Sequence, residues 1–219
     1  MKHKYKAVIF DLDGTLVDTL EDIAVSMNRA LKLRGFPELA PEEYREKVGW
    51  GIERLAFLSL PPEARSSETA AIIAKDAAGF YAETPLVFSK TYPGIPELVA
   101  ALVGSKVKTA VLTNKPDPVA QKVIAGLFPN GSFSYVRGEI IGGSRKPDPD
   151  CVWELLVELE LTPSSVIVVG DSEIDMELAR LSGCFALGVS WGYRSREIIR
   201  EAGAKHIIET PEELLDILY

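Results

Sequence analysis

The stretch AVIFDLDGT, residues 7–15, joins a run of four apolar residues to a short polar motif. An apolar run without polar alternation is typical of a strand that is buried on both faces of a parallel sheet. Two carboxylates at the end of such a strand, Asp11 and Asp13, are unfavourable unless a cation compensates them. Gly14 allows a tight turn there, and the Thr15 hydroxyl can hydrogen-bond a carboxylate. A plain surface turn, which Asp-x-Asp-Gly often forms, is the alternative interpretation.

Three further apolar runs of this kind occur at residues 109–112, 166–169 and 185–189, with amphipathic helical segments between them. The apolar stripes of these segments consist of Val152, Leu155, Leu156 and Leu159, and of Ile174, Leu178 and Leu181. For the first helix we expect Asp148 as N-cap and Pro149 as first residue. Alternating strands and helices predict an α/β fold, a doubly wound parallel sheet with helices on both faces. Ligands of such sheets bind beyond the carboxyl ends of the strands.

One segment, residues 16–85, interrupts the alternation because it has helical spacings and no convincing strand. The apolar residues at helical spacing are Leu20, Ile23, Ala24, Met27 and Leu31, followed by Ile73, Ala77 and Phe80. We therefore expect an all-helical insert at residues 16–85, and an α/β core made of residues 1–15 and 86–219. Without the insert, the core has an ordinary domain size.

The chain of 219 residues contains 47% hydrophobic and 26% charged residues, which is the composition of a soluble globular protein. Its formal net charge of −8 disfavours nucleic acid and anionic membranes as main partners, because both need a positive field. No apolar stretch approaches the roughly 18 residues of a membrane span. The apolar run at residues 7–10 is too short for a secretory signal. These features predict a cytoplasmic protein, and no feature specifies its oligomeric state.

Cysteine and histidine are too few for a zinc site or a disulfide framework. The cysteines are Cys151 and Cys184, and the histidines are His3 and His206. We expect both cysteines to be reduced, buried and without chemical function.

Two further polar motifs suit a phosphate group. Thr113 and Asn114 directly follow residues 109–112, and their hydroxyl, amide and backbone N–H groups suit phosphate oxygens, although such residues are also ordinary in loops. Lys146 lies just before a predicted helix, where a surface salt bridge is the alternative role.

Another carboxylate, Asp171, follows residues 166–169 in the way that Asp11 follows the first strand. Ser172 and Asp175 have the spacing of a capping box, so capping a helix is the alternative role for Asp175.

These motifs converge on one edge of the predicted sheet, because the carboxyl ends of parallel strands meet there. Carboxylate oxygens favour Mg²⁺, a hard cation. A carboxylate that attacks a phosphate dianion is repelled unless magnesium and lysine offset the charge, and aspartate is an established covalent nucleophile for phosphoryl groups. The motifs thus indicate phosphoryl transfer, without deciding between Asp11 and Asp13 as the nucleophile.

In this order, the motifs resemble those of the haloacid dehalogenase superfamily over nearly the whole chain. They are DLDGTLVDT at residues 11–19, Leu-Thr at 112–113, Lys-Pro at 146–147 and Gly-Asp-Ser-x-x-Asp at 170–175. The helical insert looks like the helical cap of that superfamily. Val-Gly-Trp-Gly at 48–51, with the helix expected at 16–34, is similar to the phosphoglycolate phosphatases in particular.

The resemblance implies a magnesium-dependent phosphatase that acts on a small phosphorylated metabolite. Asp11 would be the nucleophile that forms a phosphoaspartate, and Asp13 would be the general acid and then the general base. Mg²⁺ would be bound by the carboxylates of Asp11 and Asp171 and by the main-chain carbonyl of Asp13. An aspartate at position 13 implies phosphate-ester chemistry rather than dehalogenation.

The resemblance also assigns supporting roles. Thr113 and Lys146, with Asn114 beside them, would bind the phosphoryl group. Thr15 and Asp175 would contact the residues that bind the substrate and the metal, without touching either ligand. Trp50, between two glycines, would either line the inner face of the cap or pack as an ordinary core tryptophan.

Three alternative functions use similar residues. A sugar-phosphate mutase similar to β-phosphoglucomutase would return the phosphoryl group to a sugar, and a pyrophosphatase would act on an anhydride. A phospho-accepting signalling module would also gather aspartates, a threonine and a lysine at strand ends. Such a receiver needs only a core of one domain, so the insert counts against it. Continuous release of phosphate distinguishes an enzyme from a receiver.

Overall fold

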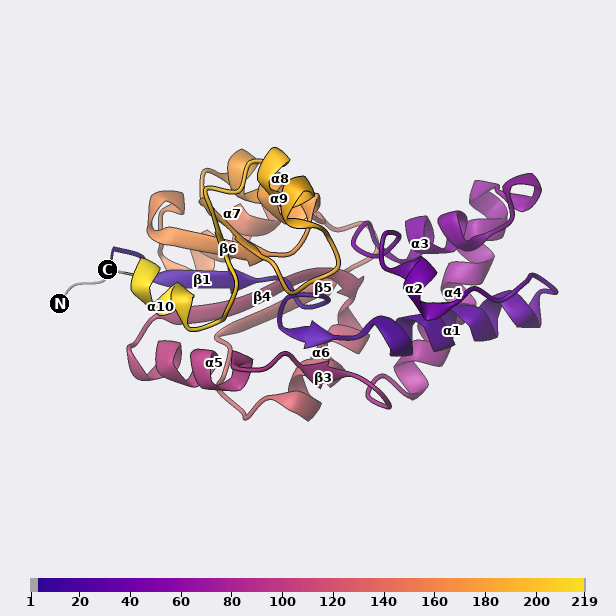
Figure 1. Ribbon diagram of the computed structural model, residues 1–219, viewed down its shortest axis with the longest axis horizontal. Helices are drawn as coiled ribbons and strands as arrows, with labels where there is room; N and C mark the ends of the chain where they lie inside the picture. The colour runs from indigo at the N-terminus through magenta and orange to yellow at the C-terminus, as the bar shows by residue number, and fades with distance from the viewer. Residues whose placement is uncertain (1–3, 219) are drawn as a thin grey trace.

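The computed structural model describes residues 4–218, and its centre is a six-stranded sheet with the strand order β5-β4-β1-β6-β7-β8 (Figure 1). The strands are β1 (Ala7–Phe10), β4 (Lys108–Pro116), β5 (Tyr135–Glu139), β6 (Val166–Gly170), β7 (Phe185–Val189) and β8 (His206–Ile208). Every neighbouring pair in this sheet is parallel. The predicted α/β class is therefore confirmed. His3 lies outside the described residues.

Helices cover both faces of the sheet, because side chains alternate along each buried strand. In β1, Val8 and Phe10 pack in one apolar cluster, while Ala7 and Ile9 pack in another. The first cluster contains residues of α5 (Ile95–Gly104), α6 (Asp117–Leu127) and α10 (Glu213–Ile217). The second contains residues of α7 (Asp150–Leu159), α8 (Glu173–Ser182) and α9 (Arg196–Glu201). Because every side chain of β1 is buried in one or the other of these apolar clusters, a polar residue is unfavourable at each position, which explains the unbroken apolar run.

Strand β1 lies at the point where the strand order reverses. The chain goes from β4 outward to β5 on one side of β1, and from β6 outward to β7 and β8 on the other side. The loops after β1, β4 and β6 therefore leave a crevice beyond the carboxyl end of β1, which is the usual ligand position in sheets of this kind.

A helical insert, defined here as α1 to α4, projects from one end of the sheet (Figure 1, the purple helices at the right). Its elements are α1 (Leu20–Leu33), α2 (Pro41–Tyr44), α3 (Ile52–Ser59), a 3₁₀ turn (Pro62–Ala64) and α4 (Ser67–Glu83). Alanines on α4 allow close helix packing: Ala70, Ala74 and Ala77 are buried beside Ile73.

The expectation that residues 16–85 contain no strand is wrong. Strand β2 (Val17–Asp18) pairs antiparallel with β3 (Lys90–Thr91), so a short ribbon joins the two ends of the helical insert. Two-residue strands are too short to give a periodic pattern, which is why the sequence did not reveal them. The domain boundaries at residues 16 and 85 stay a prediction.

Other details of the elements also differ from expectation. Strand β4 extends beyond the apolar run predicted at residues 109–112 and ends at Pro116, and its pairing with β5 becomes irregular after Leu112. Helix α7 is assigned from Asp150, one residue later than expected, although the Pro149 backbone is already helical. The Asp148 carboxylate accepts a hydrogen bond from the Asp150 N–H at 3.0 Å, which is the contact expected of an N-cap side chain. In α8, Leu181 is 39% exposed, because the buried face of the last turn is formed by Ser182 instead.

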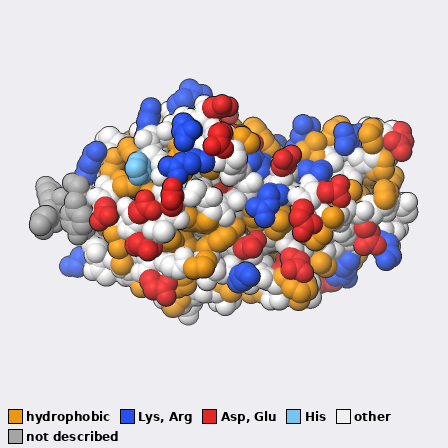
Figure 2. Space-filling model, in the orientation of Figure 1, with side chains coloured by type: hydrophobic (Ala, Val, Ile, Leu, Met, Phe, Trp, Pro, Cys, Tyr) orange, Lys and Arg blue, Asp and Glu red, His pale blue; other side chains and the backbone are white. Residues whose placement is uncertain are grey.

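Acidic and basic side chains are interspersed on the face of the molecule shown in Figure 2. No helix within residues 4–218 has both the length and the apolar character needed to cross a bilayer.

One buried carboxylate holds the helical insert to the segment that returns to the sheet. Asp22 of α1 is 2% exposed and accepts hydrogen bonds from the N–H groups of Phe88 and Ser89 and from the Ser89 hydroxyl. These donors have no comparable local partner, since they lie in the loop before β3.

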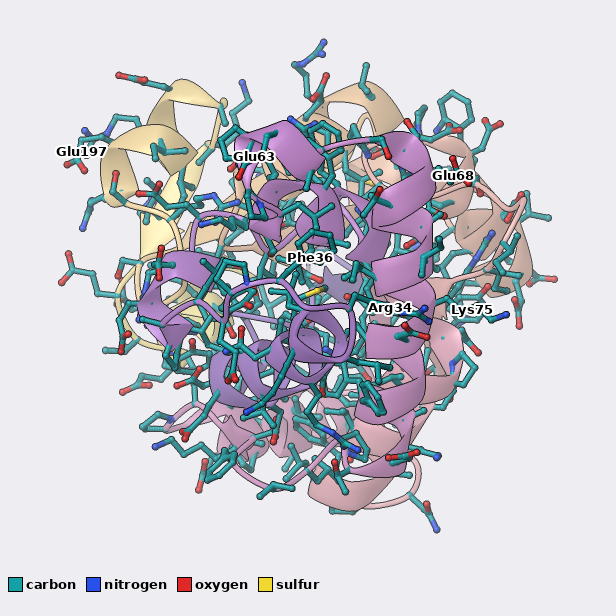
Figure 3. The ribbon with its side chains drawn as sticks, turned by 90° about the vertical axis from the view of Figure 1, so that its right-hand side faces the viewer. Arg34, Phe36, Glu63, Glu68, Lys75 and Glu197 are labelled. Carbon is teal, nitrogen blue, oxygen red and sulfur yellow. The ribbon has the colours of Figure 1, made fainter. Side chains whose placement is uncertain are left out.

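We expect Asp22→Ala to lower the free energy of unfolding by about 1–3 kcal/mol, because it leaves partly buried backbone donors without an acceptor. Urea unfolding would measure this loss. The control is Asp76→Ala, which removes a surface ion pair with Arg34 and should lower the free energy of unfolding by less than about 1 kcal/mol. Arg34 is labelled in Figure 3. Equal losses in the two variants would contradict the structural role of Asp22.

Candidate active site

The motif residues of three adjacent strands meet at the carboxyl edge of the sheet. Asp11 follows β1, Thr113 lies near the end of β4, and Asp171 follows β6. Because β1 pairs in parallel with both β4 and β6, these three ends lie side by side. Asp11, Thr113 and Asp171 all line one cavity. The sequence therefore located this group of residues correctly.

A buried lysine joins two of the carboxylates. The Lys146 Nζ lies 2.8 Å from Asp11 Oδ1 and 2.7 Å from Asp175 Oδ1, and all three side chains are less than 10% exposed. Lys146 is thus not the surface ion pair that was the alternative interpretation. Asp175 also accepts hydrogen bonds from the N–H and the hydroxyl of Ser172, so it caps α8 and binds the lysine at once.

Asn114 holds the backbone that carries this lysine. Its Oδ1 accepts a hydrogen bond from the Lys146 N–H at 2.9 Å, and its Nδ2 donates to the Lys146 carbonyl at 3.0 Å. The same Nδ2 donates to the carbonyl of Gly49 in the insert. In the structure, the Asn114 amide is therefore engaged with backbone groups. Its predicted contact with phosphate stays a prediction.

Asp171 has neutral donors only. Its carboxylate accepts hydrogen bonds from the Thr15 hydroxyl at 3.1 Å and from the Tyr193 N–H at 2.7 Å. No lysine or arginine in the part of the chain that the structure describes forms an ion pair with it. Two glycines give it room, because a Cβ on Gly14 or on Gly192 would lie less than 2.5 Å from Asp171 atoms. Gly14 is therefore required by close approach as well as by its φ of 82°.

Burial dominates the electrostatics of these groups. It raises the pKa of Asp11 to about 8, an effect that Lys146 opposes and that Asp175 and Asp171 reinforce. Burial also raises the pKa of Asp171 to about 7, again with a contribution from Asp175. For the Lys146 ammonium, burial acts against the charge, but the two neighbouring carboxylates outweigh it and raise the pKa.

The donor set fits a hard divalent cation. Asp11, Asp171 and Asp175 each bring a carboxylate oxygen to within 4.8 Å of the others. One ammonium does not balance three buried carboxylates, and oxygen ligands with excess negative charge are the chemistry that Mg²⁺ prefers. Because Lys146 and Ser172 already engage Asp175, the carboxylates of Asp11 and Asp171 are the better placed pair.

Asp13 belongs to a second network, which reaches into the helical insert. Its carboxylate accepts hydrogen bonds from the Thr19 hydroxyl at 2.5 Å and from Lys115 Nζ at 2.7 and 3.0 Å. Lys115 also donates to the Tyr81 hydroxyl of α4, and Thr19 lies 3.3 Å from the Tyr193 hydroxyl.

Three residues of this network, Lys115, Tyr81 and Tyr193, were not predicted from the sequence as site residues. Lys115 had a signal, because it continues the polar run of Thr113 and Asn114 at the end of β4. The two tyrosines had none, since each lies in a segment without a motif.

The cavity lies between the sheet edge and the insert. The insert contributes mainly apolar side chains to its wall, namely Ile23, Met27, Val48, Ile52, Leu55 and Ala77. The free volume of the cavity is about 60 Å³, enough for a few water molecules or a small ligand.

Arg194, in the loop after β7, also lines the cavity. Its guanidinium donates to the carbonyls of Arg45 and Val48 and pairs with Glu173. Trp50 is not among the residues that line the cavity: its indole N–H donates to Glu173, and the residue is 37% exposed. Trp50 is therefore no core residue, and a contact with substrate stays a prediction.

Comparisons with known proteins agree with this fold. The model of the family of haloacid dehalogenase-like hydrolases matches residues 8–189. The phosphoglycolate phosphatase of Aquifex aeolicus is 32% identical over 188 residues, covering 86% of each chain. That of Rhodospirillum rubrum is 34% identical over 220 residues, covering 97% of this chain and 90% of its own. A crystal structure from Lactobacillus delbrueckii subsp. bulgaricus superposes with a TM-score of 0.90 at 32% identity, over 98% of this chain and 99% of that one.

The raised pKa of Asp171 predicts a pH-dependent stability. The folded protein keeps a proton that the unfolded chain, with an ordinary aspartate, releases near pH 4. This contribution to stability is therefore present at low pH and lost as the pH rises through about 7. With a chelator present, the free energy of unfolding of the wild type should fall between about pH 5.5 and about pH 7.5. In the Asp171→Asn variant, this fall should be smaller by about 2 kcal/mol.

Urea unfolding at several pH values would measure this difference. The control is Asp148→Asn, which changes an exposed carboxylate. Its free energy of unfolding should depend on pH in the same way as that of the wild type. An unchanged slope in Asp171→Asn would show that Asp171 titrates as an ordinary carboxylate.

Proposed function

The chain belongs to the haloacid dehalogenase-like hydrolase family, and we propose that it is a magnesium-dependent phosphatase that hydrolyses a small phosphomonoester through a phosphoaspartate on Asp11. Its relatives named phosphoglycolate phosphatase favour 2-phosphoglycolate as the substrate. The free volume of the cavity supports a substrate of that size.

The observation that carries the proposal is the contact between Asp11 and Lys146 at the carboxyl end of β1. A carboxylate there faces the cavity, and an ammonium 2.8 Å away can bind a phosphoryl oxygen while it holds the nucleophile in place. The Thr113 hydroxyl, on the next strand, is available for a second phosphoryl oxygen.

Magnesium would be held by the carboxylates of Asp11 and Asp171 and by the main-chain carbonyl of Asp13. When bound, it supplies positive charge that offsets the repulsion between Asp11 and the phosphate dianion. Asp175 would support the site indirectly, through Lys146, and Thr15 would do so through Asp171.

Asp11 and Asp13 divide the chemistry between them. An oxygen of Asp11 attacks phosphorus, the bond from phosphorus to the ester oxygen breaks, and Asp13 gives its proton to the leaving oxygen. Asp13 then takes a proton from water, whose oxygen attacks the phosphoaspartate and releases phosphate and Asp11. Asp13 is suited to proton transfer because two donors, Thr19 and Lys115, orient its carboxylate toward the cavity.

The two aspartates should differ in a phosphoenzyme experiment. A positioned acid or base contributes about 10²–10⁴-fold, so Asp13→Asn should lower turnover by that order while leaving the nucleophile intact. With acetyl phosphate, whose leaving group departs without protonation, Asp13→Asn should accumulate one hydroxylamine-labile phosphoryl adduct in intact-mass spectrometry.

Asp11→Asn should form no adduct, because it lacks the attacking carboxylate. Adducts of equal yield on both variants would contradict Asp11 as the nucleophile. Steady phosphate release by the wild type would exclude the receiver-like alternative, which stops after one equivalent.

The metal site predicts a second difference. Chelation should abolish activity, and Asp171→Ala should need at least about 10-fold more magnesium for half-maximal rate, because it removes a carboxylate ligand. The rate measured against magnesium concentration would test this. Asp148→Ala, which removes an exposed carboxylate outside the cavity, should keep the wild-type dependence. A wild-type response in Asp171→Ala would remove Asp171 from the set of ligands.

A further inference from the structure

Lys115 is a buried cation whose only part in the chemistry described above is to orient the Asp13 carboxylate. Its side chain is 2% exposed and leaves β4 toward the cavity. The Nζ lies 2.7 Å from the nearer Asp13 oxygen and 2.8 Å from the Tyr81 hydroxyl, and 4.3 Å from the centre of the Tyr81 ring. An ammonium has three N–H groups, and in this structure they face the two Asp13 oxygens and the Tyr81 hydroxyl. A ligand anion in the cavity would take over the N–H that makes the longer contact with Asp13, at 3.0 Å.

The position of Lys115 next to Asp13 places it beside the leaving group. The inference rests on the proposed function, in which Asp13 gives a proton to the ester oxygen and must be within hydrogen-bond distance of it. A group on the carbon next to that oxygen therefore lies within reach of Lys115, whose Nζ is itself in hydrogen-bond contact with Asp13.

The other walls of the cavity offer less to an anion. The side chains from the insert are mainly apolar, such as Ile23, Met27 and Leu55. The second cation in the wall, Arg194, is paired with Glu173 and donates to two backbone carbonyls of the insert. Lys115 is therefore the cation placed for the alcohol part of the substrate.

The geometry points to Lys115 as a specificity residue that binds an anionic group on the alcohol part of the substrate, such as a carboxylate on the carbon next to the phosphorylated oxygen. Tyr81 is a positioning residue, because its hydroxyl and ring hold the ammonium between core and insert. Selection for the anion thus depends on helix α4 of the insert, although Lys115 itself belongs to the sheet.

Two esters with the same skeleton test this role: 2-phosphoglycolate and its neutral amide. The quantity measured is the ratio of their kcat/KM values, with magnesium present. The wild type should prefer the carboxylate. Lys115→Met should lower the ratio about 10- to 100-fold, the effect of one hydrogen bond to a charged group, mainly through a higher KM for 2-phosphoglycolate. Lys115→Arg, which keeps the charge, should retain more of the ratio than Lys115→Met.

Two further variants separate specificity from a structural role. Tyr81→Phe keeps the ring but lacks the hydroxyl, so it should raise the KM for 2-phosphoglycolate and leave the amide little changed. Lys122→Met removes a lysine that donates to the Ala82 carbonyl on the surface, and it should keep the wild-type ratio.

The outcomes distinguish this inference from the proposed function. Equal losses on both esters in Lys115→Met, or a wild type without preference for the carboxylate, would overturn the role of Lys115 while leaving the phosphatase intact. Absence of phosphate release from both esters and from p-nitrophenyl phosphate in the wild type would instead contradict the proposed function itself.

Discussion

The burial of three carboxylates beside one ammonium is the constraint on which the site depends. Lys146 contacts Asp11 and Asp175, and Asp171 lies beside them with neutral donors only. Removing several charges from water is unfavourable unless they are paired, so the excess negative charge favours binding of a cation at this edge of the sheet. Burial, reinforced by the nearby Asp175 carboxylate, raises the pKa of Asp171, and a bound divalent cation would lower it again.

Several features of the fold serve this arrangement. The apolar strands β1, β4 and β6 bring their ends together because they pair in parallel, and glycines at positions 14 and 192 let the backbone approach Asp171 closely. Asn114 connects the end of β4 to the loop of Lys146 through both the oxygen and the nitrogen of its side-chain amide. The positions of the charged side chains are thus fixed by rigid backbone rather than by the flexible side chains alone.

The helical insert contributes to the same cavity in a different way. It supplies an apolar wall and few polar groups to the cavity. Its polar contacts with the core include Tyr81 with Lys115, the Gly49 carbonyl with Asn114, and the carbonyls that Arg194 binds. Chemistry resides in the sheet edge, whereas the size and polarity of the remaining space depend on the insert. This division explains why motifs identify the reaction more readily than the substrate.

The sequence by itself determined the α/β class, the helices of the insert and the aspartates, threonine and lysine at the sheet edge, because unbroken apolar runs and the residues after them are local signals. It did not determine the β2–β3 ribbon, whose strands are too short, or the contact of Lys115 with Tyr81. It also left Trp50 undecided, and only the structure placed the indole at the surface on Glu173. Lys115 and Tyr81 are 34 residues apart and Thr19 and Tyr193 are 174 apart, so no periodicity relates them. Such pairs meet only in the tertiary structure, because their contact depends on how segments far apart in the sequence pack against one another.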